Sequence, residues 1–250
     1  KEIASENHRD AMTTWWSWWP FGLSGDEANC EVVEFQDDAL AVPTFELLNA
    51  EWEELQIAVV RSFLSNKEVE DIVQMKQQFP LKEIDDRDDE LVYRHEVWRM
   101  EHELKEAFPD IYQRLMDYCR AFDAELWHEI EIGDRFFPEI EYIVYDVARL
   151  GEAGKIEPHT DNQSQVTVVI LLSHERDFSG GVNHFEPGFD GGESRTAKLK
   201  RGDAVFFYGD QCMHWISPVV SGRRTILQME LSRGWHRCPL GSFEGFNFGC

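Results

Sequence analysis

The sequence predicts an α+β chain that is mainly β, with its strands concentrated in the C-terminal third. Two observations support this class: apolar residues recur at helical spacing between residues 65 and 127, and short apolar runs separated by glycine turns occupy residues 140–231. With 250 residues, 42% of them hydrophobic, the chain can bury a substantial core. This length is compatible with one large domain or with a small helical domain fused to a barrel.

Three helices are expected before the strands. The first begins at Ser65, because Ser65 and Glu68 have the spacing of a capping box, and it ends before Pro80. The second is expected over residues 95–108. The third begins near Pro109 and continues to about residue 127, with one apolar face.

The second helix contains two His-Glu pairs, of which His95 and Glu96 form the first. Their spacing is not that of the H-E-x-x-H metalloprotease motif, so they cannot place two imidazoles on one metal as that motif does. We interpret both pairs as exposed helix residues.

The strand-rich third contains a candidate metal site. His159 and Asp161 are separated by one residue, and in an extended segment that spacing directs both side chains to the same side. His214 follows an apolar strand and a Gly-Asp turn, and it begins another strand. Two imidazoles and one carboxylate form the ligand set of the facial triad, which holds Fe(II) and leaves positions open for substrate and O₂.

A basic pair lies ten residues beyond the second histidine. Arg224 precedes residues 225–231, whose alternation predicts a strand with one face in a core. An arginine there would direct a planar charged fork into a pocket, which suits an organic carboxylate. Arg223 is the alternative, and because neighbours on a strand point to opposite faces, only one of the two can enter the pocket.

From about residue 141 to residue 233, the chain resembles the catalytic core of the 2-oxoglutarate and Fe(II)-dependent dioxygenases, in particular the prolyl 4-hydroxylase-like branch. A weaker resemblance to the same branch covers residues 57–65. Four segments carry the main resemblance: Pro-His-Thr-Asp at 158–161, Phe-Ser-Gly-Gly at 178–181, the run from Leu to Phe at 199–207, and the run from His to Arg at 214–224.

The resemblance implies a double-stranded β-helix, also called a jelly roll or cupin-like fold, with supporting α-helices from the N-terminal half. The expected organisation is a helical support region over residues 44–136 and a catalytic core over residues 137–235, which together form one structural domain. Residues 236–250 are expected to form a C-terminal tail. Residues 1–43 are expected to form a Trp-rich segment that packs on the core.

The resemblance also implies roles for the site residues. His159, Asp161 and His214 would bind the iron, and Arg224 would pair with the distal carboxylate of 2-oxoglutarate. We favour Arg224 over Arg223 because members of the branch usually have one residue between the preceding glycine and the basic residue.

Two further residues are expected near the co-substrate. Tyr145 occupies a position where family members often place a tyrosine, although a core tyrosine with a satisfied hydroxyl is the alternative. Leu171 stands where certain members have a tyrosine that contacts the co-substrate carboxylate. That contact is therefore missing here or is supplied by another residue, for which we name Thr167.

In the implied reaction, O₂ oxidatively decarboxylates 2-oxoglutarate to succinate and CO₂, and this step is coupled to hydroxylation of an unactivated C–H bond. Ascorbate is expected to support the activity. Asp161 argues against a halogenase, because halogenases of this family lack the carboxylate ligand at that position.

The first-choice substrate is a prolyl residue of a protein or peptide, and a free amino acid or other small molecule is the second. A non-catalytic cupin-like protein that binds or senses a metal is the alternative from another class.

Composition restricts partner and compartment. The net charge of −24 argues against a nucleic acid as main partner, since phosphate binding depends on Lys and Arg. The longest apolar stretch, residues 166–172, is too short to span a membrane, so we expect a soluble protein of the cytoplasm or the secretory-pathway lumen. Five cysteines without a C-x-x-C pair leave the compartment open, and oligomeric state is not predicted.

Four tryptophans gather near the N-terminus, at positions 15, 16, 18 and 19. The segment is too aromatic for a flexible linker, so we expect it to bury its large rings against the fold. A patch that binds a partner or the substrate is the functional alternative.

Overall fold

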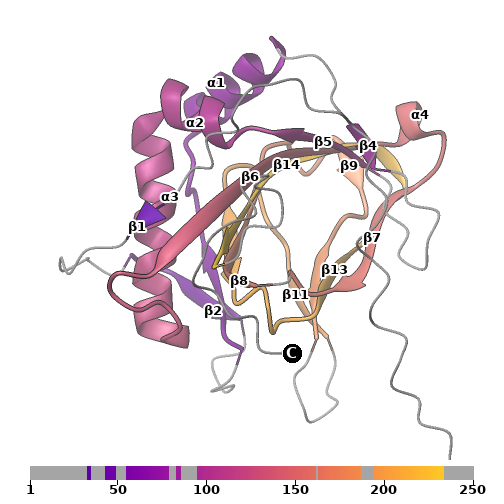
Figure 1. Ribbon diagram of the computed structural model, residues 1–250. Coiled ribbons are helices and arrows are strands. Elements are labelled where there is room, and N and C mark those ends of the chain that lie inside the picture. Colours follow the sequence, from indigo (N-terminus) through magenta and orange to yellow (C-terminus); the bar gives the residue numbers. More distant parts are fainter. Residues whose placement is uncertain are drawn as a thin grey trace, which may run out of the picture. The chain divides into compact units, whose positions relative to one another are not determined.

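The computed structural model has two antiparallel sheets that face each other across a shared interior (Figure 1). It describes residues 33–34, 43–48, 55–78, 83–85, 95–161, 163–186 and 194–233, all within one compact unit, Cys30–Cys238. The larger sheet follows the order β2-β3-β12-β8-β14-β6-β5-β4, and the smaller sheet follows the order β11-β10-β13-β7. This is the predicted double-stranded β-helix.

The strands of the larger sheet come from both halves of the chain. They are β2 (Glu46–Leu48), β3 (Ile57–Val60), β4 (Glu83–Asp85), β5 (His95–Arg99), β6 (Arg135–Asp146), β8 (Ser164–Leu171), β12 (Ala204–Phe207) and β14 (Ser221–Ser232), with β1 (Val33–Glu34) beside β6 and β9 (Phe178–Ser179) beside β14. The smaller sheet contains β7 (Gly154–His159), β10 (Asn183–Phe185), β11 (Arg195–Ala197) and β13 (His214–Val219).

Alternation along the strands divides the larger sheet into two apolar faces. On the outer face, residues such as Tyr142 and Leu227 belong to one buried cluster together with the helices. On the inner face, residues such as Ile143 and Ile226 belong to a second cluster that also contains Ile216 of the smaller sheet. The interior between the sheets is therefore a second core, and side chains on the inner face point toward the site described below.

The outer face is covered by α1 (Asn66–Lys76), α2 (Glu101–Ala107) and α3 (Pro109–Phe122), which lie on the side of the larger sheet away from the smaller one (Figure 1). Helix α1 begins at the predicted capping box: the Ser65 hydroxyl accepts from the Glu68 amide, and the Glu68 carboxylate accepts from the Ser65 amide. The helix ends at Lys76, a few residues earlier than expected; Pro80 lies outside the described residues.

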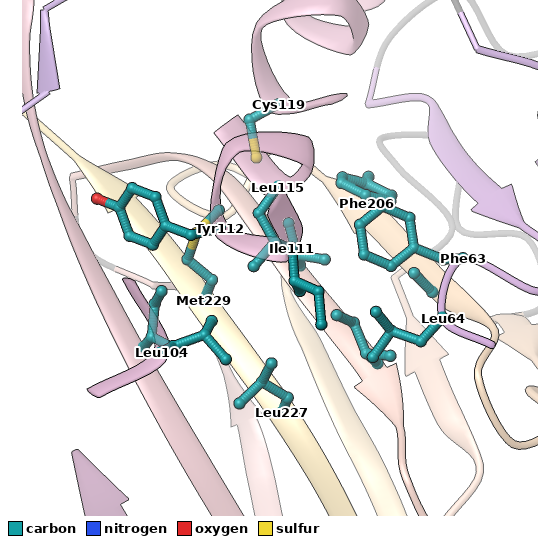
Figure 2. Packing of buried hydrophobic residues seen from close by; sticks show 14 of the residues in the cluster. Phe63, Leu64, Leu104, Ile111, Tyr112, Leu115, Cys119, Phe206, Leu227 and Met229 are labelled. Atoms are coloured by element: carbon teal, nitrogen blue, oxygen red, sulfur yellow. The ribbon is translucent and has the colours of Figure 1, made fainter. Parts of the chain in front are cut away.

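Helix α3 has the predicted start, with Pro109 as its first residue, and a five-residue π turn, Asp123–Trp127, extends it to the predicted end. Its apolar side chains point onto the sheet, where Ile111 and Leu115 lie among residues of β12 and β14 (Figure 2). Leu115 is 0% exposed, so replacing it by alanine would cost about 2–5 kcal/mol of stability.

The expectation of one helix over residues 95–108 is wrong in its first half. Residues His95–Arg99 form β5, which pairs with β4 and β6, and α2 begins only at Glu101. His95 and Glu96 are 4% and 1% exposed, so their interpretation as exposed residues is also wrong. Pairing with two neighbouring strands overrides the local helical pattern, and such pairing is not visible in a short window of sequence.

The proposed N-terminal and C-terminal segments lie almost entirely outside the described residues. Of residues 1–43, the structure describes Val33, Glu34 and Pro43, and the first two pair with Phe136 and Arg135 of β6. The four tryptophans and the tail over residues 236–250 are not among the described residues. Within the described part of the chain, no helix has the length and apolar character needed to cross a membrane.

Candidate metal centre

Three side chains with metal-binding atoms meet at one end of the interior between the sheets. His159 ends β7 and His214 begins β13, and the two residues are direct partners across these strands, with ring centroids 4.3 Å apart. Their Nε2 atoms lie 3.4 Å and 3.5 Å from the two carboxylate oxygens of Asp161. All three ligand atoms lie within 4.8 Å of one another, so one ion can contact all of them.

Each histidine is oriented by a backbone carbonyl. The Nδ1 atom of His159 lies 2.8 Å from the carbonyl oxygen of Glu157, and Nδ1 of His214 lies 2.9 Å from that of Cys212. Because a carbonyl oxygen only accepts, each Nδ1 carries the proton and donates it. This leaves the lone pair of each Nε2 free for a metal, the arrangement that supports histidine ligands in metal sites.

Two hydrogen bonds, one from its backbone and one to its side chain, hold Asp161 in place. Its backbone amide donates to the carbonyl of Gly209 at 3.0 Å, and its Oδ2 accepts a 2.6 Å hydrogen bond from the Thr167 hydroxyl. The Ser164 hydroxyl lies 3.0 Å from that of Thr167 and completes the chain. A ligand held by a second hydrogen-bonding residue needs little reorganisation when an ion binds.

Electrostatics keep the carboxylate ionised. Burial raises the pKa of Asp161, but the two histidines and the Thr167 hydroxyl outweigh burial and hold the pKa below its ordinary value. Burial is the largest single influence on the pKa of His159 and lowers it, but the hydrogen bond and charge of Asp161, together with backbone hydrogen bonds, outweigh burial, so the net shift is upward. For His214 burial dominates and lowers the pKa, which favours the neutral imidazole that a metal requires.

At the other end of the interior, Arg224 is 1% exposed on β14. Its partner across the strands is Tyr145 of β6, whose ring centroid lies 5.3 Å from the guanidinium carbon. Its Nη2 donates to the side-chain oxygen of Asn183 at 3.0 Å, and Asn183 and Tyr145 both line the pocket that contains His159 and His214. The guanidinium therefore lies between the sheets, beside the metal pocket.

The charge of Arg224 has no carboxylate partner. Among the described residues no Asp or Glu forms an ion pair with it, and its Nε and Nη1 atoms are buried without a hydrogen-bond partner. Burying a guanidinium without a counter-charge costs several kcal/mol of folding free energy. Binding an anion beside it would recover a similar amount. The donor set fits the carboxylate of a keto acid such as 2-oxoglutarate.

A glycine makes room for this guanidinium. Gly181 has φ +65°, and a Cβ placed there would lie 2.5 Å from Cδ of Arg224. The residues around Gly181 also line a pocket of about 330 Å³ that Arg224 and Asn183 share. Arg224 therefore lines this second pocket, and Asn183 lines both pockets.

The neighbouring arginine points away. Arg223 has a side chain that is 53% exposed and pairs at 4.0 Å with Asp146 on the surface. The structure therefore confirms the alternation expected for the pair, with Arg224 inside and Arg223 outside.

The two other residues named from the sequence lie on the same inner face. Tyr145 is 2% exposed beside Arg224, and Thr167 is 0% exposed. The side-chain hydrogen bonds of Thr167 are with Asp161 and Ser164, and not with Arg224. A role for either residue in binding 2-oxoglutarate stays a prediction.

Sequence reasoning did not single out Gln228 and Glu230. Both follow Arg224 on β14 at intervals of two, so both lie on its inner face, and Gln228 lines the metal pocket. The sequence does contain a signal for them: in the strand after Arg224, two polar residues occupy positions that share a face with the arginine and that would otherwise be expected to be apolar.

The fold and the site together define a class: a double-stranded β-helix protein with the His-Asp-His group of a facial-triad metal centre. Residues 145–229, which include all three ligands and Arg224, match the family model of the 2OG-Fe(II) oxygenase superfamily. The part of the chain that carries the candidate site is therefore similar to that superfamily, where 2OG denotes 2-oxoglutarate. The prediction of a 2-oxoglutarate-dependent dioxygenase is confirmed at this level.

Solved structures of prolyl-4-hydroxylase-like oxygenases have the same fold. A Pseudomonas putida prolyl-4-hydroxylase has a TM-score of 0.55 at 15% identity, covering 72% of this chain and 93% of its own. A Trichoplax adhaerens prolyl hydroxylase, in complex with a peptide fragment of the hypoxia inducible factor oxygen degradation domain, has a TM-score of 0.54 at 14% identity, covering 71% and 83%. An oxidoreductase of the 2OG-Fe(II) oxygenase family from Burkholderia pseudomallei has a TM-score of 0.51 at 16% identity, covering 71% and 84%.

No curated protein matches the sequence. At identities this low, the solved structures support the fold and leave the substrate open.

Proposed function

We propose that this protein is an Fe(II)- and 2-oxoglutarate-dependent hydroxylase that acts on a prolyl residue of a protein or peptide and releases succinate and CO₂. One observation carries the proposal: three metal-binding side chains converge at one end of an interior whose other end holds a buried, uncompensated arginine. A chelating keto acid needs both features: a metal centre for its keto acid end and a cation for its distal carboxylate.

His159, Asp161 and His214 would hold the iron, with Nε2 of each histidine and the carboxylate as ligands. When bound, Fe(II) supplies the redox chemistry that couples decarboxylation of the keto acid to oxygen insertion into a C–H bond, and ascorbate keeps the metal reduced. Arg224 would hold the distal carboxylate through Nε and Nη1, the atoms that have no hydrogen-bond partner among the described residues.

Apolar side chains form the walls of the metal pocket. Val169, Phe207 and Ile226 line the metal pocket and are buried between the sheets. Apolar walls exclude bulk water, which strengthens the pairing of Arg224 with a carboxylate and keeps the oxidising chemistry away from solvent. Tyr145 would position the guanidinium through its ring and hydroxyl.

Succinate formation tests the reaction class. The purified chain is mixed with Fe(II), ascorbate and 2-oxoglutarate, and succinate is measured by NMR with and without a pool of prolyl peptides. We expect slow uncoupled formation without peptide and a gain of one oxygen on a prolyl peptide in the pool.

The matched variants are Asp161→Ala and His102→Ala. Asp161→Ala removes a ligand and should abolish succinate formation, whereas His102 has a side chain that is 71% exposed on α2, so His102→Ala should leave it unchanged. Absence of metal-dependent succinate under all these conditions would favour a cupin-like protein that binds metal without turnover. Succinate with oxygen gained only by non-prolyl compounds would retain the oxygenase and reject the prolyl substrate.

A further inference from the structure

The inner face of the larger sheet changes character beyond the metal centre. Near Arg224 it is apolar, but at the opposite end of the same strands it carries carboxylates. On β14 and β6, Gln228 is the partner of Glu141, and Glu230 is the partner of Glu139. Because strand partners point to the same face, these side chains share the interior with the metal ligands.

Glu230 is connected to the metal pocket in two ways. Its Oε1 accepts a 3.0 Å hydrogen bond from Nε2 of Gln228, which lines the pocket together with the metal-binding histidines. Its other strand partner is Thr167, the residue that donates to Asp161. Glu230 is also partly exposed, so its side chain is not fully enclosed by the protein.

The negative charge at this end is incompletely neutralised. Arg99 forms 2.7 Å ion pairs with both Glu139 and Glu141. Glu230, in contrast, forms no ion pair with any described residue; its hydrogen-bond donor is the neutral amide of Gln228. Burial and the nearby charges of Asp161, Glu141 and Glu139 raise the pKa of Glu230 well above its ordinary value, although Arg99 is close enough to interact with it through its charge. The single guanidinium of Arg99 thus faces three carboxylates, those of Glu139, Glu141 and Glu230.

A second acceptor on this face also has no donor. Gln165 lies on β8 two residues before Thr167, so it shares the inner face, and it is 5% exposed. Its Nε2 donates to the carbonyl of Gln163, but its Oε1 is buried without a hydrogen-bond partner. Buried acceptors without donors are costly, so a ligand that donates hydrogen bonds would stabilise this end of the inner face.

A metal ion does not explain these groups. Among the described residues, the only set of three or more His, Cys, Asp or Glu side chains close enough to share an ion is His159, Asp161 and His214. The carboxylates around Glu230 are too dispersed for one ion, and an organic cation carried by the substrate meets the same demand for charge and donors.

We propose that the substrate presents a protonated amine or guanidinium to Glu230, so that Glu230 is a specificity-determining residue for a basic substrate. The inference rests on the proposed hydroxylase function and narrows its substrate class: the target C–H lies on, or next to, a basic side chain. Gln228 positions Glu230, and Gln165 offers a further acceptor to the same cation.

Mn(II)-loaded protein with 2-oxoglutarate tests this without turnover. The probes are Nα-acetyl-L-lysinamide and its neutral near-isostere Nα-acetyl-L-norleucinamide, and proton line broadening by Mn(II) reports both affinity and approach to the metal. We expect the lysine probe to bind at least tenfold more tightly, and Glu230→Gln to remove about that preference. The matched control is Glu106→Gln, which removes the same charge from a side chain that is 69% exposed on α2.

The results separate this inference from the proposed function. Mn(II) and 2-oxoglutarate affinities of each variant are measured by EPR and calorimetry, which also shows that Glu230→Gln is folded. Equal binding of the two probes, an unchanged preference in Glu230→Gln, or an equal loss in Glu106→Gln would overturn the inference while leaving 2-oxoglutarate binding intact. If the wild-type protein does not bind 2-oxoglutarate, the proposed hydroxylase function is rejected instead. In that case, a preference for the lysine probe that depends on Glu230 would still show a cation-binding site.

Discussion

The hydroxyl of Thr167 donates a 2.6 Å hydrogen bond to Oδ2 of Asp161, the same oxygen that lies 3.5 Å from Nε2 of His214. Thr167 is therefore hydrogen-bonded directly to a candidate metal ligand. A bond of this kind fixes the direction of the carboxylate and keeps one of its lone pairs occupied, so that the remaining ones are directed toward the ion.

Removing this bond should weaken metal binding. In Thr167→Val the shape of the side chain is nearly kept but Asp161 loses its donor, and we expect the affinity for Mn(II) to fall by about 10–100-fold. Thr167→Ser retains the hydroxyl and should remain close to wild type. Mn(II) titration followed by EPR measures both. Equal affinities in Val and Ser variants would contradict a role for the hydroxyl.

Arg224 should control the affinity for 2-oxoglutarate and not for the metal. Arg224→Gln removes the buried charge, so we expect a loss of about 3 kcal/mol in binding of 2-oxoglutarate to the Mn(II)-loaded protein, which is more than 100-fold. Arg223→Gln removes the same charge from the exposed neighbour and should cost less than a factor of about three. Calorimetry measures both, and a larger effect of Arg223 would reverse the assignment.

Much of the centre could be predicted from sequence because its determinants are local. The one-residue gap between His159 and Asp161, and the alternation that separates Arg223 from Arg224, are direct consequences of extended backbone. The strands that carry them were also predicted, since their apolar runs are bounded by glycine turns. The structure adds that His214 is the partner of His159 across two strands, a pairing for which sequence contains no local signal.

What could not be predicted depends on long-range pairing. Residues His95–Arg99 form a strand because β4 and β6 flank them. Thr167 contacts Asp161 because the chain after β7 turns back toward β8, and the acidic environment of Glu230 arises because β6 places Glu139 opposite it. Each of these depends on register between segments, and a one-residue change in register would reverse the face of every side chain involved.

The capping box of α1 should give the protein a pH-dependent stability. Partial burial raises the pKa of Glu68, but hydrogen bonds from the Ser65 amide and from Arg114 outweigh burial and hold the pKa below its ordinary value of 4.5. A lowered carboxyl pKa contributes stability that is present above pH 4.5 and is lost as pH falls through the folded-state pKa.

Glu68→Gln should therefore unfold more readily than wild type at neutral pH, by about 1 kcal/mol because the side chain is partly solvated. The difference should shrink as the pH falls below 4.5. Urea unfolding at a series of pH values measures it, with Glu106→Gln on the exposed side of α2 as the comparison. A difference that stays constant with pH would show that the carboxylate charge is not the cause.

Gly181 should be required for the position of Arg224. An alanine there has two costs: the φ of +65° strains a residue with a Cβ, and the Cβ would lie 2.5 Å from Cδ of Arg224, closer than van der Waals contact permits. Gly133→Ala isolates the first cost, because Gly133 has φ +86° with no atom within 4 Å of the added Cβ. Gly133→Ala should lose about 1–2 kcal/mol of stability in urea unfolding, and Gly181→Ala at least as much. Only Gly181→Ala should displace the guanidinium and weaken 2-oxoglutarate binding by about tenfold or more. If the two variants bind 2-oxoglutarate equally well, then either Arg224 relaxes around the new methyl group or another residue anchors the keto acid, and the Arg224→Gln measurement distinguishes these two outcomes.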